Sequence, residues 1–151
     1  MFRKKKKLFS VLAVCCLSVF LSGCTGPIRG KVVDSTIDEA SADAPIAGAT
    51  VFLLKKSIDW EPGYIVDKIV NFDPTNDADV ISFINEQLSD VSLDGQTTTD
   101  AQGEFLFEDK DGAAFYGVLA FKQGYKLDFA MTSIDFLGLG LTSRTVSLDP
   151  R

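Results

Sequence analysis

The chain has 151 residues, 21 of them acidic and 15 basic, and it contains no histidine. That length accommodates about one domain. Without histidine the chain cannot form a Ser-His-Asp triad, a Cys-His pair or a zinc site with imidazole ligands. We therefore expect no enzymatic activity, no cofactor and no metal site.

The first 23 residues have the layout of a secretion signal. Arg3 and Lys4–Lys7 precede an apolar run over residues 8–21, and small residues then lead directly into Cys24. The run is shorter than the roughly 20 residues that cross a bilayer as a helix. Leu21-Ser22-Gly23-Cys24 resembles the lipobox of a bacterial lipoprotein precursor. The resemblance implies cleavage before Cys24 and attachment of fatty acyl chains, such as palmitate, to that residue.

The lipoprotein resemblance also predicts where the protein resides. Residues 24–27 would form a lipidated tether that holds the domain on a membrane without spanning it. In the Gram-negative pattern an aspartate after the cysteine retains the protein at the inner membrane, so Thr25 favours the outer membrane. The expected location is the bacterial cell envelope, and the membrane is the first expected partner.

Removal of the leader changes the charge balance. Residues 1–23 hold five of the 15 basic residues and none of the 21 acidic ones, which leaves a net charge of −11. Such a surface repels phosphate backbones, so we do not expect a nucleic-acid partner. Cys15 and Cys16 lie in the leader, so no disulfide is expected in the mature domain.

The mature chain begins with two predicted strands, residues 28–34 and 49–55. In the first, Ile28, Gly30 and Val32 share one face. The second is apolar on both faces, so we expect other elements to cover both of its sides. The acidic stretch 35–47 between them is predicted to be an exposed loop.

Residues 57–94 interrupt the strand pattern, and their second half has helical signals. Asp73 is the predicted N-cap and Pro74 the first helical residue of a helix of about 15 residues. One apolar stripe would pack onto the sheet: Val80, Ile81, Ile84, Leu88 and Val91. Four neighbouring residues could also supply oxygen ligands to calcium, namely Asp73, Asn76, Asp77 and Asp79. Helix capping explains the same residues without a metal.

The remaining predicted strands follow at short intervals. Residues 97–100 and 104–108 are predicted to form a hairpin, with Gly103 supplying a positive φ in the turn. Phe105 and Phe107 would share one face of its second strand. Three further strands are predicted, over residues 115–122, 127–132 and 142–148.

Four segments resemble the carboxypeptidase regulatory-like domain, a transthyretin-like or prealbumin-like β-sandwich. They are Gly30–Asp34, Pro45–Val51, Thr97–Phe107 and Lys122–Tyr125, and the Thr-Asp-x-x-Gly-x-Phe pattern of Thr99–Phe105 is the most specific. The resemblance implies an all-β fold over residues 28–149. That fold is a seven-stranded Greek-key sandwich, prealbumin-like or Ig-like, with one inserted helix. No zinc-peptidase domain accompanies it, so the resemblance implies no peptidase activity.

The long insertion, residues 57–94, is the main departure from that family. Unusually long connections are often functional. Its aromatic residues Trp60, Tyr64 and Phe72 are candidates for partner contacts, although covering the sandwich would explain each of them as well. The hypothesis is a lipid-anchored, non-catalytic envelope module that binds another envelope protein or a glycan. A structural spacer without a ligand and a carboxylate-dependent glycan hydrolase are the alternatives.

Overall fold

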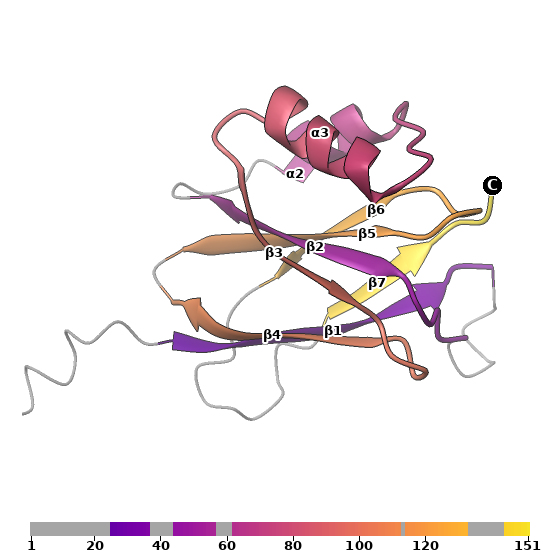
Figure 1. The fold of residues 1–151 in the computed structure, drawn as a ribbon, viewed down its shortest axis with the longest axis horizontal. Helices are drawn as coiled ribbons and strands as arrows, with labels where there is room; N and C mark the ends of the chain where they lie inside the picture. Colours follow the sequence, from indigo (N-terminus) through magenta and orange to yellow (C-terminus); the bar gives the residue numbers. More distant parts are fainter. Residues whose placement is uncertain (1–24, 37–43, 57–61, 113, 133–143) are drawn as a thin grey trace, which may run out of the picture.

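The computed structural model describes residues 25–36, 44–56, 62–112, 114–132 and 144–151, which form a two-sheet sandwich with helices on one outer face (Figure 1). Its strands are β1 (Thr25–Asp34), β2 (Thr50–Lys56), β3 (Ser92–Thr98), β4 (Glu104–Asp111), β5 (Phe115–Phe121), β6 (Asp128–Thr132) and β7 (Arg144–Leu148). Its helices are α2 (Pro62–Ile69) and α3 (Asp77–Gln87). The predicted seven-stranded β-sandwich is confirmed.

The strands divide into a three-stranded sheet, in the order β4-β1-β7, and a four-stranded sheet, in the order β3-β2-β5-β6. β1 pairs with β4 in antiparallel and with β7 in parallel orientation, and every pair in the larger sheet is antiparallel. The chain changes sheets after β1, β3, β4 and β6. These crossings produce the Greek-key connectivity that the fold class implies.

Two apolar cores lie on opposite sides of the larger sheet. One fills the space between the sheets and includes Ile28, Val32, Val51, Leu53 and Phe105. The other lies between the larger sheet and the helices and includes Phe52, Leu54, Ile65, Ile69, Val80, Phe83, Ile84, Leu88, Leu119 and Phe121. Alternate residues of β2 enter different cores, so the prediction that this strand is covered on both sides is confirmed.

The predicted hairpin over residues 97–108 is wrong, because β3 and β4 belong to different sheets. The turn itself is tight, since the Asp100 side chain accepts hydrogen bonds from the backbone N–H groups of Gln102 at 2.9 Å and Glu104 at 2.8 Å. The tertiary contacts decide the pairing. The Thr99 hydroxyl is bonded to the backbone just before β2, whereas the Gly103 carbonyl accepts from Val32 of β1 at 2.8 Å.

The inserted region holds two helices, not the one expected. α3 begins at Asp77, and its cap is Asn76, whose side chain accepts from the Asp79 N–H at 3.1 Å. Asp73 is therefore not the cap, and the helix has 11 residues instead of about 15. α2 was not predicted. The insertion also ends earlier than expected, because β3 begins at Ser92.

Two further boundaries differ from the expected ones. β1 begins at Thr25, so residues 25–27, assigned to a tether, are part of the sheet. Ile46, within the predicted loop 35–47, is only 7% exposed, and its N–H donates to the Val32 carbonyl. Within the described ranges, neither helix is long and apolar enough to cross a bilayer.

Candidate functional site

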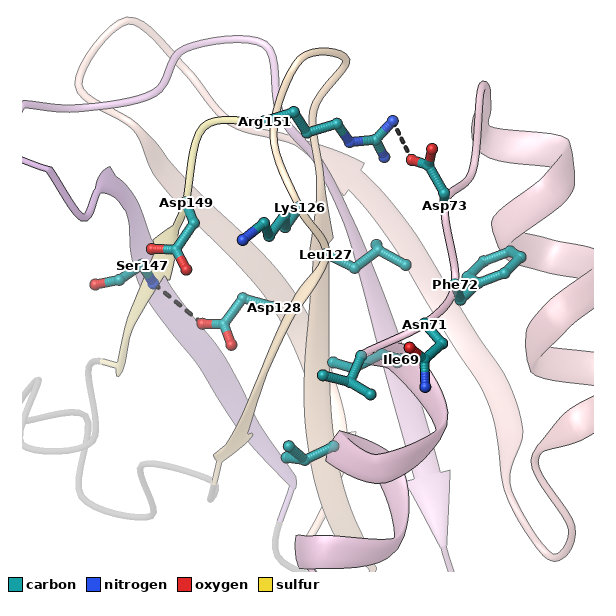
Figure 2. A pocket seen from close by; sticks show the side chains of 12 residues that line it. Ile69, Asn71, Phe72, Asp73, Lys126, Leu127, Asp128, Ser147, Asp149 and Arg151 are labelled. Atoms are coloured by element: carbon teal, nitrogen blue, oxygen red, sulfur yellow. Dashed lines mark hydrogen bonds and ion pairs between the residues drawn. The ribbon is translucent and has the colours of Figure 1, made fainter.

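A cavity of about 720 Å³ lies between α2 and the adjoining ends of β6 and β7 (Figure 2). Its first wall is formed by Val66, Ile69, Val70, Asn71, Phe72 and Asp73. Its second wall is formed by Lys126, Leu127, Asp128, Ser147, Asp149 and Arg151. The first wall is mainly apolar and the second is mainly charged, so the cavity has two chemically distinct sides.

The periodicity of α2 directs some of its apolar side chains into the core and others outward. Ile65 and Ile69 point down into the core, where they are 0% and 7% exposed. Val66 and Val70 lie on the outer side and are 46% and 71% exposed. Two exposed valines at helical spacing give the first wall of the cavity an exposed apolar surface.

Phe72 completes this wall just after α2. Its ring stacks on that of Phe83 in α3, with the ring centroids 4.2 Å apart and the planes at 13°. Stacking of this kind fixes the ring's orientation. The Phe72 ring, in the segment between the helices, is therefore held in one orientation at the cavity wall.

The second wall is held together by hydrogen bonds. The Ser147 N–H donates to Asp128 Oδ2 at 3.3 Å, and the Ser35 hydroxyl donates to the Asp149 carboxylate. Arg151 spans the two walls, because its guanidinium donates to the carbonyls of Tyr125 at 2.8 Å and Pro74 at 3.2 Å and pairs with Asp73. These bonds fix the C-terminal residues against the loop that follows α2.

Asp128 lies in the second wall of the cavity and has a raised pKa. Burial raises its pKa above the ordinary value of an aspartate, and the negative charge of Asp149 raises that pKa further. Hydrogen bonds from the backbone of Phe129 and Ser147 lower it in part. Figure 2 shows Asp128 and Asp149 on the same side of the cavity, with Lys126 above Asp128.

This arrangement suits binding through mixed contacts. The volume lies within the roughly 300–1,000 Å³ of small-molecule sites, which combine apolar surface with a few polar groups. The carboxylates can accept hydrogen bonds, the lysine can donate them, and the valines offer apolar area. In the parts of the chain that the structure describes, no three acidic, cysteine or histidine residues are grouped to hold a metal ion.

The four residues considered for calcium have separate partners. Asp77 accepts hydrogen bonds from Thr50 at 3.0 Å and from Gln96 at 3.2 Å, and Asp79 accepts from Thr75 at 2.7 and 2.8 Å. Asn76 caps α3, and Asp73 pairs with Arg151. These contacts serve the ends of the helix and its attachment to the sheet.

The structure does not bring together the predicted site residues that it describes. Phe72 lines the cavity, but Tyr64 does not. The Tyr64 hydroxyl contacts the Gln87 carbonyl at 3.3 Å and Ser89 Oγ at 3.2 Å, so it links α2 to the end of α3. Cys24 and Trp60 lie outside the described residues.

Sequence reasoning missed most of the cavity. Asp128 and Asp149 lie on or after short C-terminal strands, and only the fold brings them opposite α2. One local signal was available. Val66 and Val70 have the i, i+4 spacing of a helix face, yet α2 was not predicted, so this apolar pair was not recognised.

Comparison with known proteins concerns the fold. No family model matches the chain, and no curated protein matches it. Similar solved structures include the shaft pilin SpaA from Lactobacillus rhamnosus GG, with 10% identity and a TM-score of 0.47. That match covers 84% of this chain and 52% of the pilin, so the chain spans about half of the pilin's length.

Two other solved structures are similar at the same level. A 3-chlorocatechol 1,2-dioxygenase from Rhodococcus opacus has 17% identity and a TM-score of 0.44, over 86% of this chain and 61% of the enzyme. A candidate carbohydrate-binding protein from Pseudomonas aeruginosa has 13% identity and a TM-score of 0.44. That match covers 84% of this chain and 89% of the Pseudomonas protein. At such identities the likeness concerns the β-sandwich architecture and not the activity.

Proposed function

We propose that this protein is a lipid-anchored, non-catalytic binding module of the bacterial cell envelope, and that its ligand is a glycan. The cavity between α2 and the ends of β6 and β7 is the proposed binding site. Its partly exposed valines would contact the apolar face of a sugar ring, and its carboxylates and lysine would bond the hydroxyl groups. The envelope location and the anchor at Cys24 rest on the lipobox resemblance of residues 21–24.

The observation that supports a glycan most directly is the composition of the two walls. Val66 and Val70 face one side of the cavity, and Asp128 and Asp149 lie on the other. Sites of this kind gain affinity from apolar area and orientation from a small number of polar groups. A ligand that is apolar on one face and hydroxylated at its edge satisfies both walls at once.

The carboxypeptidase regulatory-like assignment is part of the proposal. It is supported by the structural roles of its most specific residues. Asp100 accepts two backbone hydrogen bonds in the turn, Gly103 has a φ of 73°, and Phe105 is buried between the sheets. These roles concern folding, so they support the family assignment but do not identify a ligand.

Titration of the domain with envelope glycans tests the binding proposal. Fragments of peptidoglycan and of lipopolysaccharide core would be added while NMR amide shifts are recorded. We expect shifts at Val66, Val70 and Leu127. Asp128→Asn should weaken binding by about 10-fold, because a hydrogen bond to a charged group contributes roughly 1.5–3 kcal/mol.

Glu104→Gln is the matched control, because it makes the same change at an exposed position of β4 in the other sheet. It should leave the affinity unchanged. Binding of an envelope peptide at this cavity, with no glycan bound, would instead favour the protein ligand. Turnover of a glycan that requires Asp128 or Asp149 would overturn the non-catalytic assignment.

The anchor is tested separately in cells. Labelling with a palmitate analogue should mark the wild-type protein, and Cys24→Ala should abolish the label. A Cys24→Ala protein that still carries the label would contradict lipid attachment at Cys24. This result does not depend on which ligand the cavity binds.

A further inference from the structure

The sheet begins one residue after the proposed lipid-bearing cysteine. Thr25 pairs with Asp111 and Gly26 with Lys110, so both residues are already part of the three-stranded sheet. Consecutive Cα atoms are about 3.8 Å apart across a trans peptide. No residue therefore separates Cys24 from the first paired residue of β1.

Other strand ends meet at the same end of the sandwich. β4 runs antiparallel to β1 and ends at Asp111, beside the start of β1. β2 ends at Lys56, which pairs with Phe115 at the start of β5. We call this end the anchor end and define it by Thr25, Lys56, Lys110, Asp111 and Phe115.

The chemistry of the anchor end is compatible with a membrane surface. Lys110 pairs with Asp94 at 2.9 Å, and Lys55 pairs with Asp111 at 3.7 Å, so each of these two carboxylates is matched by a lysine. Phe115 is 43% exposed. In a domain of net charge −11, this charge pairing lowers the repulsion that the described residues of the anchor end meet from anionic headgroups.

The cavity lies toward the opposite end. Asp128 pairs with Ala120, near the end of β5, and Asp149 follows β7, whose last residue pairs with Asp34 at the end of β1. A strand rises by about 3.3 Å per residue, so the length of β1 separates the two ends by roughly 30 Å. Figure 1 shows β1 starting at the left and the C-terminus at the right.

We propose that the anchor end rests on the bilayer surface and that the sandwich holds its cavity away from the membrane. This proposal rests on lipid attachment at Cys24. A chain without a spacer limits how far the domain can tilt or move away from the lipid. The ligand would then reach the cavity from the aqueous side of the membrane.

The orientation can be measured with single-thiol probes. The only cysteine retained after cleavage is Cys24, which the lipid occupies, so each introduced cysteine would be the sole free thiol. We would attach a fluorophore to Phe115→Cys at the anchor end and, in a second protein, to Gln102→Cys, which is exposed at the opposite end. The full lipoprotein would be placed in phosphatidylethanolamine–phosphatidylglycerol vesicles that carry nitroxide headgroups.

We expect strong quenching at position 115 and little at position 102. Equal quenching at both positions, or stronger quenching at 102, would overturn the orientation. A third protein with ten Gly-Ser residues inserted between Cys24 and Thr25 should lose most of the quenching at 115, since such a linker reaches about 17 Å on average. Unchanged quenching there would show that the missing spacer does not set the orientation.

Failure of the anchor itself has a different signature. If lipid were not attached, none of the proteins would float with the vesicles, and mass spectrometry would show no acyl chains on Cys24. Flotation with acylated Cys24 but without a difference between the probes would refute only the orientation.

Discussion

Gly103 shows how one residue directs the chain between the two sheets. Its φ is 73°, a conformation that residues with a Cβ rarely adopt, and a Cβ there would lie 2.6 Å from the Val32 carbonyl oxygen. The same residue's carbonyl accepts the Val32 N–H. Glycine is therefore required both by the backbone conformation and by the close approach of β1.

We expect Gly103→Ala to destabilise the domain by about 3 kcal/mol, combining backbone strain with the clash. Gly124→Ala is the matched control. Gly124 also has a positive φ, 89°, but a Cβ added there would have no atom within 4 Å apart from those of the two adjacent residues. Strain alone should cost it about 1 kcal/mol. Urea unfolding of both variants measures the difference, and equal losses would contradict the role of the Val32 contact.

Asp128 gives the stability of the domain a pH dependence with a definite sign. Its pKa is raised in the folded state, mainly by burial. Between the ordinary pKa of an aspartate and this higher value, the folded state holds more protons than the unfolded state. Stability therefore falls as the pH rises through that interval.

Asp128→Asn should remove this fall, because the amide does not ionise but can still accept the Ser147 hydrogen bond. Relative to wild type, the melting temperature of the variant should increase more at pH 7.5 than at pH 3.5. Thermal unfolding at both pH values provides the measurement. The same difference at both pH values would contradict a raised pKa at Asp128.

At the scale of elements, the start of α3 depends on which of two side chains caps the helix. Asn76 and Asp73 both precede the helix, and both are residue types that cap helices well. Asn76 bonds the Asp79 N–H, whereas Asp73 pairs with Arg151. The helix starts where a side chain reaches a free N–H group, and the loop after α2 holds Asp73 too far back to do so.

We expect Asn76→Ala to cost about 1 kcal/mol through the lost cap. Asp73→Ala removes an ion pair whose aspartate is 78% exposed, and surface pairs contribute only about 0–1 kcal/mol. Chemical denaturation ranks the two variants. Hydrogen exchange should show faster opening of the first turn of α3 only in Asn76→Ala, and the reverse pattern would restore Asp73 as the cap.

For the whole molecule, the two helices are a structural layer, and α2 also forms one wall of the cavity. They bury Ile65, Ile69, Val80, Phe83, Ile84 and Leu88 against the larger sheet. The sheet contributes Phe52, Leu54, Leu119, Phe121 and Phe129 to the same core. Removing the insertion would expose that whole face of the sheet.

Replacing residues 57–91 with a short Gly-Ser turn should prevent cooperative folding. Burial of each large apolar side chain stabilises the folded state by roughly 1.5–3 kcal/mol. The free energy of unfolding of a whole domain is only about 5–15 kcal/mol. NMR dispersion and thermal unfolding report the outcome. Val70→Ser, which changes a side chain that is 71% exposed, should leave stability within about 0.5 kcal/mol.

A sharp unfolding transition in the shortened protein would show that the sheets fold without the helices. Because we expect it to be misfolded, deletion of the insertion cannot by itself test partner binding. Substitutions at exposed cavity residues test that role without removing the second core.

Much of the fold could be predicted because its signals are local. Runs of apolar residues located most strands at least in part, but the predicted strand over residues 97–100 shares only Thr97 and Thr98 with β3. The residue pattern of Thr99–Phe105 located a tight turn with Gly103 at a positive φ. The amphipathic stripe around Val80 and Ile84 located α3. Each of these signals depends on neighbours within a few residues, so no tertiary information was needed.

The sequence by itself located most of the strands and the principal turn, excluded histidine chemistry, and supplied the lipobox resemblance on which the anchor proposal rests. Only the tertiary structure decided that β3 and β4 join different sheets, that α2 forms, and that Asp128 and Asp149 face Val66 and Val70 across a cavity. The physical reason is the range of the interactions. Strand pairing, helix docking and the burial of Asp128 depend on residues far apart in the chain, whose proximity exists only once the two sheets and the helices have packed.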